Sequence, residues 1–129
     1  MMKLNYDCLH DLLLLLEEEL TSGEHITLDE LKQKLTKYSG QDIAYTIKKA
    51  KEAGLVEATW LSADNDDNED GVYYCHCTDL TYDGHCFLNC IRNVSTWEKI
   101  KSATKKVGGK SIEVLIEIAA NIASNAFLS

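Results

Sequence analysis

The sequence predicts a mostly helical α+β fold, and three observations support that prediction. Apolar residues recur at spacings of three and four over several stretches, as they do on the buried face of a helix. Two runs rich in β-branched and aromatic residues, Leu55–Leu61 and Val72–Cys77, enclose a polar segment, which is the pattern of a β-hairpin. The 129 residues include no proline, a composition compatible with uninterrupted helices in a single domain.

The first helix is expected over residues 5–20. Its buried face carries leucines at helical spacing, namely Leu9, Leu12, Leu13, Leu16 and Leu20. Asn5 is a suitable capping residue, and Asp7 lies in the first turn, where the helix dipole favours an anion. The pair Ser22-Gly23 is expected to end this helix.

A second helix is expected to begin after Thr27. The segment Thr27-Leu28-Asp29-Glu30 is a capping box, in which the Thr27 hydroxyl accepts a hydrogen bond from the Glu30 amide and the Glu30 side chain reaches back. The buried side chains of this helix are expected to be Leu28, Leu31 and Leu35. Tyr38-Ser39-Gly40 then forms a turn, and Ser39 or Gly40 caps a third helix.

The third helix has an apolar side and a polar side. The apolar side carries Ile43, Ile47, Ala50 and Gly54, and the polar side carries Gln41, Tyr45, Lys48, Lys49 and Glu52. Gly54 ends the helix, and the two β-rich runs are expected to pair as an antiparallel hairpin with residues 62–71 at its tip. Two helices joined by a tight turn and followed by such a hairpin form a winged helix-turn-helix, here with a wing of two or three strands.

Further helices are expected after the hairpin. Thr81 caps the first of them, the capping box Ser95-Thr96-Trp97-Glu98 starts the second, and Ser111 caps the last, which runs to about Phe127. We therefore expect a winged-helix domain over residues 1–94 and a helical extension over residues 95–129 that packs on the same unit.

Several segments resemble a known family over nearly the whole chain. They are Met2-Lys3-Leu4-Asn5, Ile26 to Leu35, Ala53-Gly54-Leu55-Val56, Thr78 to His85 and Ser111-Ile112-Glu113-Val114-Leu115. These segments are similar to a family of uncharacterised small proteins encoded by bacteriophages and prophages. Separately, Ala53-Gly54-Leu55 before a strand and Leu80-Thr81-x-x-Gly84 after one resemble winged-helix regulators. The resemblance implies a fold and a phage or prophage origin, and it carries no assigned activity.

The polar side of the third helix is the candidate nucleic-acid contact. Residues 31–51 hold six lysines and one acid, although the formal net charge of the protein is -8. Because phosphate neutralisation supplies most sequence-independent DNA affinity, this local charge favours DNA binding in a regulatory module. Base edges in the major groove would be contacted by Gln41, Tyr45 and Lys48, and phosphates by Lys32, Lys37 and Lys49. The alternative is that these lysines form only the solvated faces of two helices.

The tip of the hairpin argues against simple DNA binding. Residues 55–74 hold six acids and no base, and like charges a few ångströms from a phosphate repel it. The alternative function is therefore a protein–protein adaptor that docks on a basic partner through Asp64, Asp66, Asp67, Glu69 and Asp70. The same segment only partly matches a calcium loop, because Glu69 occupies the position where such loops place glycine.

A cysteine cluster gives a weaker metal hypothesis. Cys75 and Cys77 share one face of a strand, and Cys86 and Cys90 are one helical turn apart, so the four thiolates could surround zinc. Their spacing does not match a zinc ribbon or knuckle, and buried small apolar residues follow the same pattern. No nucleophile, base and orienting group occur at a recognisable spacing, so we expect neither an enzymatic activity nor a cofactor.

The last helix indicates self-association. Its broad apolar stripe contains Ile112, Leu115, Ile116, Ala119, Ile122, Ala123 and Ala126 and suggests a homodimer. Residues 92–110 before it hold six bases and one acid, which could extend a nucleic-acid surface. No apolar run reaches the roughly 18 residues that span a bilayer, and the N-terminus lacks a signal-peptide core. We therefore expect a cytoplasmic protein without membrane contact.

Overall fold

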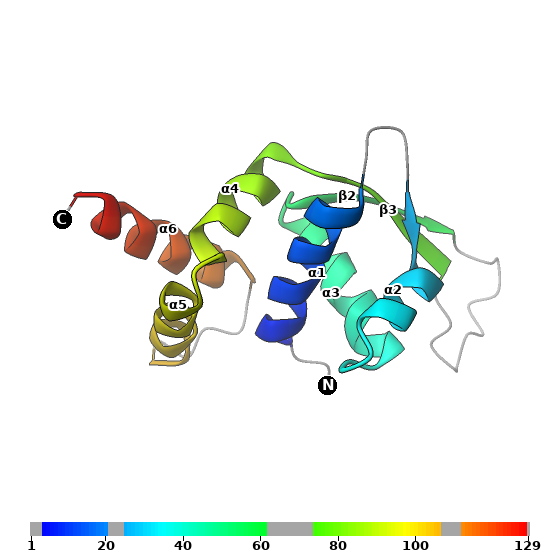
Figure 1. Cartoon of the computed structure of the whole chain (residues 1–129), viewed down its shortest axis with the longest axis horizontal. Coiled ribbons are helices and arrows are strands. Elements are labelled where there is room, and N and C mark those ends of the chain that lie inside the picture. The colour runs from blue at the N-terminus through cyan, green and yellow to red at the C-terminus, as the bar shows by residue number, and fades with distance from the viewer. Residues whose placement is uncertain (1–3, 21–24, 62–73, 107–111, 129) are drawn as a thin grey trace.

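The computed structural model describes residues 4–20, 25–61, 74–106 and 112–128 as a mostly helical α+β protein (Figure 1). The elements, in chain order, are α1 (Tyr6–Glu19), β1 (Ile26–Thr27), α2 (Leu28–Lys34), α3 (Gly40–Glu52), β2 (Val56–Leu61), β3 (Tyr74–Leu80), α4 (Tyr82–Ile91), α5 (Val94–Lys106) and α6 (Ile112–Leu128). The three strands form one small antiparallel sheet, and α5 and α6 lie at the opposite end of the molecule from it.

The first helix is confirmed as predicted. The Asn5 side chain accepts a hydrogen bond from the Cys8 amide at 3.1 Å, which caps α1. Leu9, Leu12, Leu13 and Leu16 are fully buried, as their spacing predicts. The helix ends at Leu20, whose amide donates to the Leu16 carbonyl, and the predicted stop at Ser22-Gly23 lies outside the described residues.

The caps of α2 and α3 also follow the sequence. The Thr27 hydroxyl accepts from the Glu30 amide and donates to the Glu30 carboxylate, both at 3.2 Å. Of the two candidates for the next cap, Ser39 is the one that acts, because its Oγ accepts from the Asp42 amide at 3.1 Å. Both helices therefore start at side chains that sequence spacing alone identifies.

The sheet differs from the prediction in its extent. β3 runs from Tyr74 to Leu80 and pairs with β2 over its whole length, so the strand continues past the predicted end at Cys77. β1 adds a third strand on the other side of β3, in which Thr27 pairs with His76. Two residues are too few to show the alternation of apolar and polar side chains that predicts a strand. β1 therefore forms only through its pairing with β3. The predicted acidic tip lies outside the described residues.

Two glycine motifs of the sequence meet in the structure. Gly54 has a φ of 78°, a left-handed conformation that ends α3. Its carbonyl accepts a hydrogen bond from the Thr81 hydroxyl at 2.6 Å, while the Leu55 carbonyl accepts from the Thr81 amide at 3.0 Å. A Cβ placed on Gly84 would lie 2.1 Å from the Leu55 oxygen. The start of α4 thus sits directly on the end of α3, and only glycine allows the approach.

The start of α5 corrects the prediction at Ser95. The cap is Asn93, whose side chain accepts from the Thr96 amide at 3.1 Å and whose carbonyl accepts from the Trp97 amide at 2.8 Å. Ser95 is already inside the first turn of the helix. The sequence holds two capping residues two positions apart, and asparagine caps at least as well as serine.

Replacing the two candidate caps should give different effects on stability. Asn93→Ala is expected to lower the free energy of unfolding by about 1 kcal/mol, because the Thr96 amide loses its partner. Ser95→Ala is the matched control and should be neutral or slightly stabilising, since alanine is the better residue inside a helix. Urea unfolding followed by circular dichroism measures both. A larger loss from Ser95→Ala than from Asn93→Ala would restore Ser95 as the cap.

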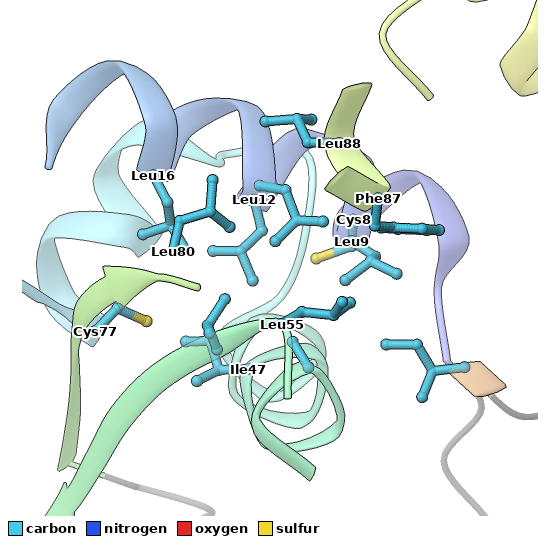
Figure 2. Close-up of a cluster of buried hydrophobic side chains, with 14 of the residues drawn as sticks. Cys8, Leu9, Leu12, Leu16, Ile47, Leu55, Cys77, Leu80, Phe87 and Leu88 are labelled. Atoms are coloured by element: carbon cyan, nitrogen blue, oxygen red, sulfur yellow. The ribbon is translucent and has the colours of Figure 1, made fainter. Parts of the chain in front are cut away.

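One buried cluster joins the elements. Figure 2 shows side chains of α1 packed between Ile47 of α3, the start of β2 and the side chains Phe87 and Leu88 of α4. The same cluster extends to Trp97 and Ile100 of α5 and to Leu115 of α6. The domain boundary predicted at residues 94 and 95 stays a prediction, and the burial is continuous across it.

Candidate nucleic-acid interface

The candidate contact residues of α3 lie on the side of the helix that faces away from the core. Ile43, Ile47 and Ala50 are fully buried, whereas Gln41 and Lys48 are exposed. α2 packs against α3, so the exposed lysines of both helices belong to neighbouring parts of the surface. The helical periodicity predicted this division into two sides, and the burial confirms it for these residues, whereas Gly54, also predicted on the apolar side, is exposed.

Lys32 is held close to the start of α3. A Cβ placed on Gly40 would lie 2.5 Å from Lys32 Cε and 3.1 Å from its Nζ. The aliphatic stem of Lys32 therefore covers the first turn of α3 while its ammonium group stays near the N-terminus of that helix. Lys32 of α2 therefore lies beside Gly40, the residue that precedes the predicted contact residue Gln41 on α3.

Lys49 and Tyr45 are less available than the sequence predicts. The Lys49 ammonium donates a hydrogen bond to the Glu52 carboxylate at 3.0 Å and lies 5.4 Å from the centre of the Tyr45 ring. The hydrogen bond to Glu52 raises the pKa of Lys49. The three side chains line a pocket of about 190 Å³, together with Leu4 and the first turn of α6. The pairing with Glu52 makes Lys49 a weaker phosphate contact than the exposed lysines around it. The i,i+3 spacing of Lys49 and Glu52 could have indicated this pairing.

Two of the six lysines in residues 31–51 form ion pairs with acids, which leaves four without one among the described residues. Lys34 pairs with Glu19 at 3.0 Å, and Lys49 pairs with Glu52. Within the described part of the chain, no acid pairs with the remaining members, which are Lys32, Lys37, Lys48 and Lys51. All four are exposed. We call these four residues the lysine patch.

Two residues of the second basic stretch, Arg92 and Lys101, also form ion pairs. Arg92 makes a two-pronged ion pair with Glu17 of α1, and the hydrogen bonds from Arg92 lower the pKa of that carboxyl. Lys101 lies 2.7 Å from Asp7 and 3.2 Å from Glu98. Glu17 and Asp7 are distant in sequence from their partners, so the charge count over residues 92–110 could not reveal these two pairs, whereas Glu98 lies within that stretch. The bonds join α4 and α5 to α1.

The cysteines of the metal hypothesis lie in different surroundings. Cys77 is fully buried in the core, Cys86 is exposed on α4, and Cys90 is half-buried. The Cys75 side chain and the acidic residues 64–70 are outside the described side chains. No three His, Cys, Asp or Glu side chains that the structure describes form a metal-binding group.

The last helix is partly covered by the rest of the protein. Ile112, Leu115 and Ala119 are buried, and Ile116, Ile118 and Ile122 are half-buried against the core. The homodimer through this helix stays a prediction. Among the described residues, no helix is long and apolar enough to cross a membrane.

Two comparisons with known proteins give a match. The chain is 27% identical over 122 residues to an uncharacterised protein of Haemophilus influenzae, which covers 95% of this chain and 92% of that protein. No solved structure matches. A family model described as "Hypothetical protein (DUF2513)" matches residues 3–111, which include all elements from α1 to α5. The chain therefore belongs to the DUF2513 family.

Proposed function

We propose that this protein is a non-enzymatic winged-helix module that binds duplex DNA and acts in transcriptional regulation. In this proposal α3 is the helix that enters the major groove, and the hairpin of β2 and β3 is the wing. The observation that carries the proposal is the lysine patch on α2, on α3 and in the turn between them. Four exposed ammonium groups without an acidic partner in the described structure give this surface a positive charge that the whole protein lacks.

The residues divide into two roles. Gln41 and Lys48 are exposed on α3, so they are the expected base contacts, whereas Lys32 and Lys37 flank them and contact phosphates. Tyr45 and Lys49 contribute less, because they are engaged with each other and with Glu52. A phage or prophage origin and a cytoplasmic location remain part of the proposal.

A homodimer would give the module two recognition helices. Operator binding by such a dimer requires the two α3 helices to lie about 34 Å apart, one turn of the duplex. The partly covered stripe of α6 is the proposed contact between the copies. Light scattering at tens of micromolar measures the oligomeric state, and a monomer at that concentration contradicts the dimer.

Charge reversal in the lysine patch tests DNA binding. Lys48→Glu is expected to weaken binding to a random-sequence duplex pool by at least about tenfold at low salt, since an attractive contact becomes repulsive. The matched control is Lys105→Glu, which makes the same charge change at an exposed residue of α5, in the basic stretch 92–110 that is not part of the proposed DNA-binding surface. This control should retain the affinity within about twofold. Fluorescence anisotropy titrations at several salt concentrations measure both variants.

The same titrations distinguish the alternative function. If the unmodified protein has no affinity for any duplex at low salt, DNA binding is wrong and the adaptor is the remaining proposal. If Lys48→Glu and Lys105→Glu weaken binding equally, the effect comes from net charge and not from α3. The adaptor would instead use the acidic residues 64–70 on a basic partner, and it would be insensitive to Lys48.

A further inference from the structure

The pairing of β1 with β3 brings two histidines together. Thr27 is opposite His76 and Ile26 is opposite Cys77 in this antiparallel pair. Ile26 and Cys77 are buried, so the alternation of side chains puts Thr27 and His76 on the other face of the sheet. His25 lies next to this position, where its ring centre is 4.9 Å from that of His76 and the ring planes are inclined by 50°.

Both rings are accessible to solutes. His25 is exposed and His76 is half-buried. His25 directly precedes β1 and His76 lies in β3, so the strand pairing keeps the two residues close together and little ordering is needed to bring them to one ligand. Neither residue has a role in the DNA-binding proposal, and 51 positions of sequence separate them. The two histidines form a preorganised pair.

The separation of the rings fits coordination of one metal ion. Imidazole nitrogen binds zinc at about 2.0–2.1 Å, which puts the ring centre roughly 3.2 Å from the ion. Two such rings in tetrahedral or square geometry have centres roughly 4.5–5.2 Å apart. The observed 4.9 Å lies within this range. Inclined rings are also compatible with two ligands that approach one ion from different directions.

We propose that His25 and His76 form a bidentate site for a late divalent transition-metal ion. Neutral imidazole is a preferred ligand of Ni²⁺, Cu²⁺ and Zn²⁺, whereas Mg²⁺ and Ca²⁺ require oxygen ligands. No third His, Cys, Asp or Glu side chain completes a group here among the residues that the structure describes. Water or an external ligand therefore fills the other coordination positions, and the affinity follows the order Cu²⁺ above Ni²⁺ above Mn²⁺.

Metal binding would stabilise a particular part of the fold. β1 directly precedes α2, and β3 is the central strand of the sheet. An ion bound by His25 and His76 would therefore hold the start of α2 close to β3. A ligand that binds only the folded state raises the midpoint of thermal unfolding. This provides a second readout that does not depend on any activity of the protein.

The test uses full-length protein without a histidine tag, in a Cys86→Ser background that removes the exposed thiol. Ni²⁺ is titrated by calorimetry, and the imidazole signals are followed by NMR, where the paramagnetic ion broadens nearby protons. We expect saturable binding with one ion per chain and broadening confined to His25 and His76. Mg²⁺ should produce no response, and Cu²⁺ should bind more tightly than Ni²⁺.

Variants identify the ligands. His25→Ala and the more conservative His25→Gln should each weaken Ni²⁺ binding by at least about tenfold, as even loss of an outer-shell partner can do. His25 is exposed and precedes β1, so both variants are expected to fold. His85→Ala is the matched control, because His85 is an exposed histidine on α4 next to Glu17. It should leave the affinity and the thermal shift unchanged.

Three results would overturn the proposal. They are the absence of binding at millimolar Ni²⁺, unchanged affinity in His25→Ala, and equal losses in His25→Ala and His85→Ala. Since no DNA enters these measurements, their outcome is independent of the DNA-binding test.

Discussion

Replacing Gly84 with alanine is expected to lower the free energy of unfolding by about 3 kcal/mol or more. The added Cβ would lie 2.1 Å from the Leu55 carbonyl oxygen and 2.7 Å from a methyl carbon of Leu80. The oxygen belongs to the backbone, so it cannot move away by a simple rotation. That carbonyl also accepts the hydrogen bond from the Thr81 amide, so any shift disturbs the cap of α4.

Helix propensity alone predicts the opposite sign for this substitution. Alanine is favoured over glycine in a helix interior by about 1 kcal/mol, so Gly84→Ala would be stabilising if the site had room. Urea unfolding by circular dichroism gives the sign. Asp83→Ala, at the exposed neighbouring position in the same helical turn, is the control and should cost no more than about 1 kcal/mol. A Gly84→Ala variant as stable as the unmodified protein would contradict the close approach of α4 to the Leu55 carbonyl, between α3 and β2.

Truncation of Trp97 is expected to have a comparable effect, about 3–5 kcal/mol. Trp97 is buried where α5 meets α1, and its ring stacks on His10 with centres 5.1 Å apart. Its Nε1 donates to the Asp7 carboxylate at 3.2 Å. Trp97→Ala therefore leaves a large cavity and removes the donor at the same time.

A comparison with Trp97→Phe separates these contributions. Phenylalanine keeps most of the apolar contact and the stacking with His10, but it cannot donate to Asp7. The cost of Trp97→Phe is therefore expected to be about 1–2 kcal/mol, mainly from the lost hydrogen bond and the smaller ring. Equal destabilisation by the alanine and phenylalanine variants would mean that the hydrogen bond, and not the packing, holds α5 on α1. Denaturant titrations of both variants give the comparison.

The Asp7 contacts also add a dependence on pH. The hydrogen bond from Lys101 lowers the pKa of Asp7, so the carboxylate contributes stability above its unfolded pKa. That contribution is lost as the pH falls through the lowered value. Its size is small, because the Asp7 side chain is 56% exposed and solvent screens the charge.

The sequence predicted the local structure well and the charge environment poorly. The caps at Asn5, Thr27, Ser39 and Thr81 and the buried sides of α1, α2 and α3 are confirmed. These features depend on residues within one or two helical turns, so spacing is sufficient to identify them. The Asn93 cap of α5 was not predicted, because the capping box that begins at Ser95 indicated a different start for this helix.

The ion pairs around the candidate site join residues that are far apart in the chain, and the spacing of residues in the sequence does not reveal such contacts. Lys34 and Arg92 were counted as free basic residues, yet each is paired with an acid of α1, at sequence separations of 15 and 75 positions. The His25–His76 pair likewise depends on a two-residue strand that has no sequence pattern. Such contacts form only when distant segments fold onto one core.

By itself, the sequence determined the helices α1 to α6, the caps of α1 to α4 and the basic character of the segment from α2 to α3. The tertiary structure decided which of those lysines remain unpaired, why Gly84 must be glycine, and which histidines meet. The physical reason is the range of the interactions. Hydrogen-bonded turns and amphipathic periodicity act over a few residues, whereas ion pairs and close backbone approaches depend on how the helices pack around the shared core.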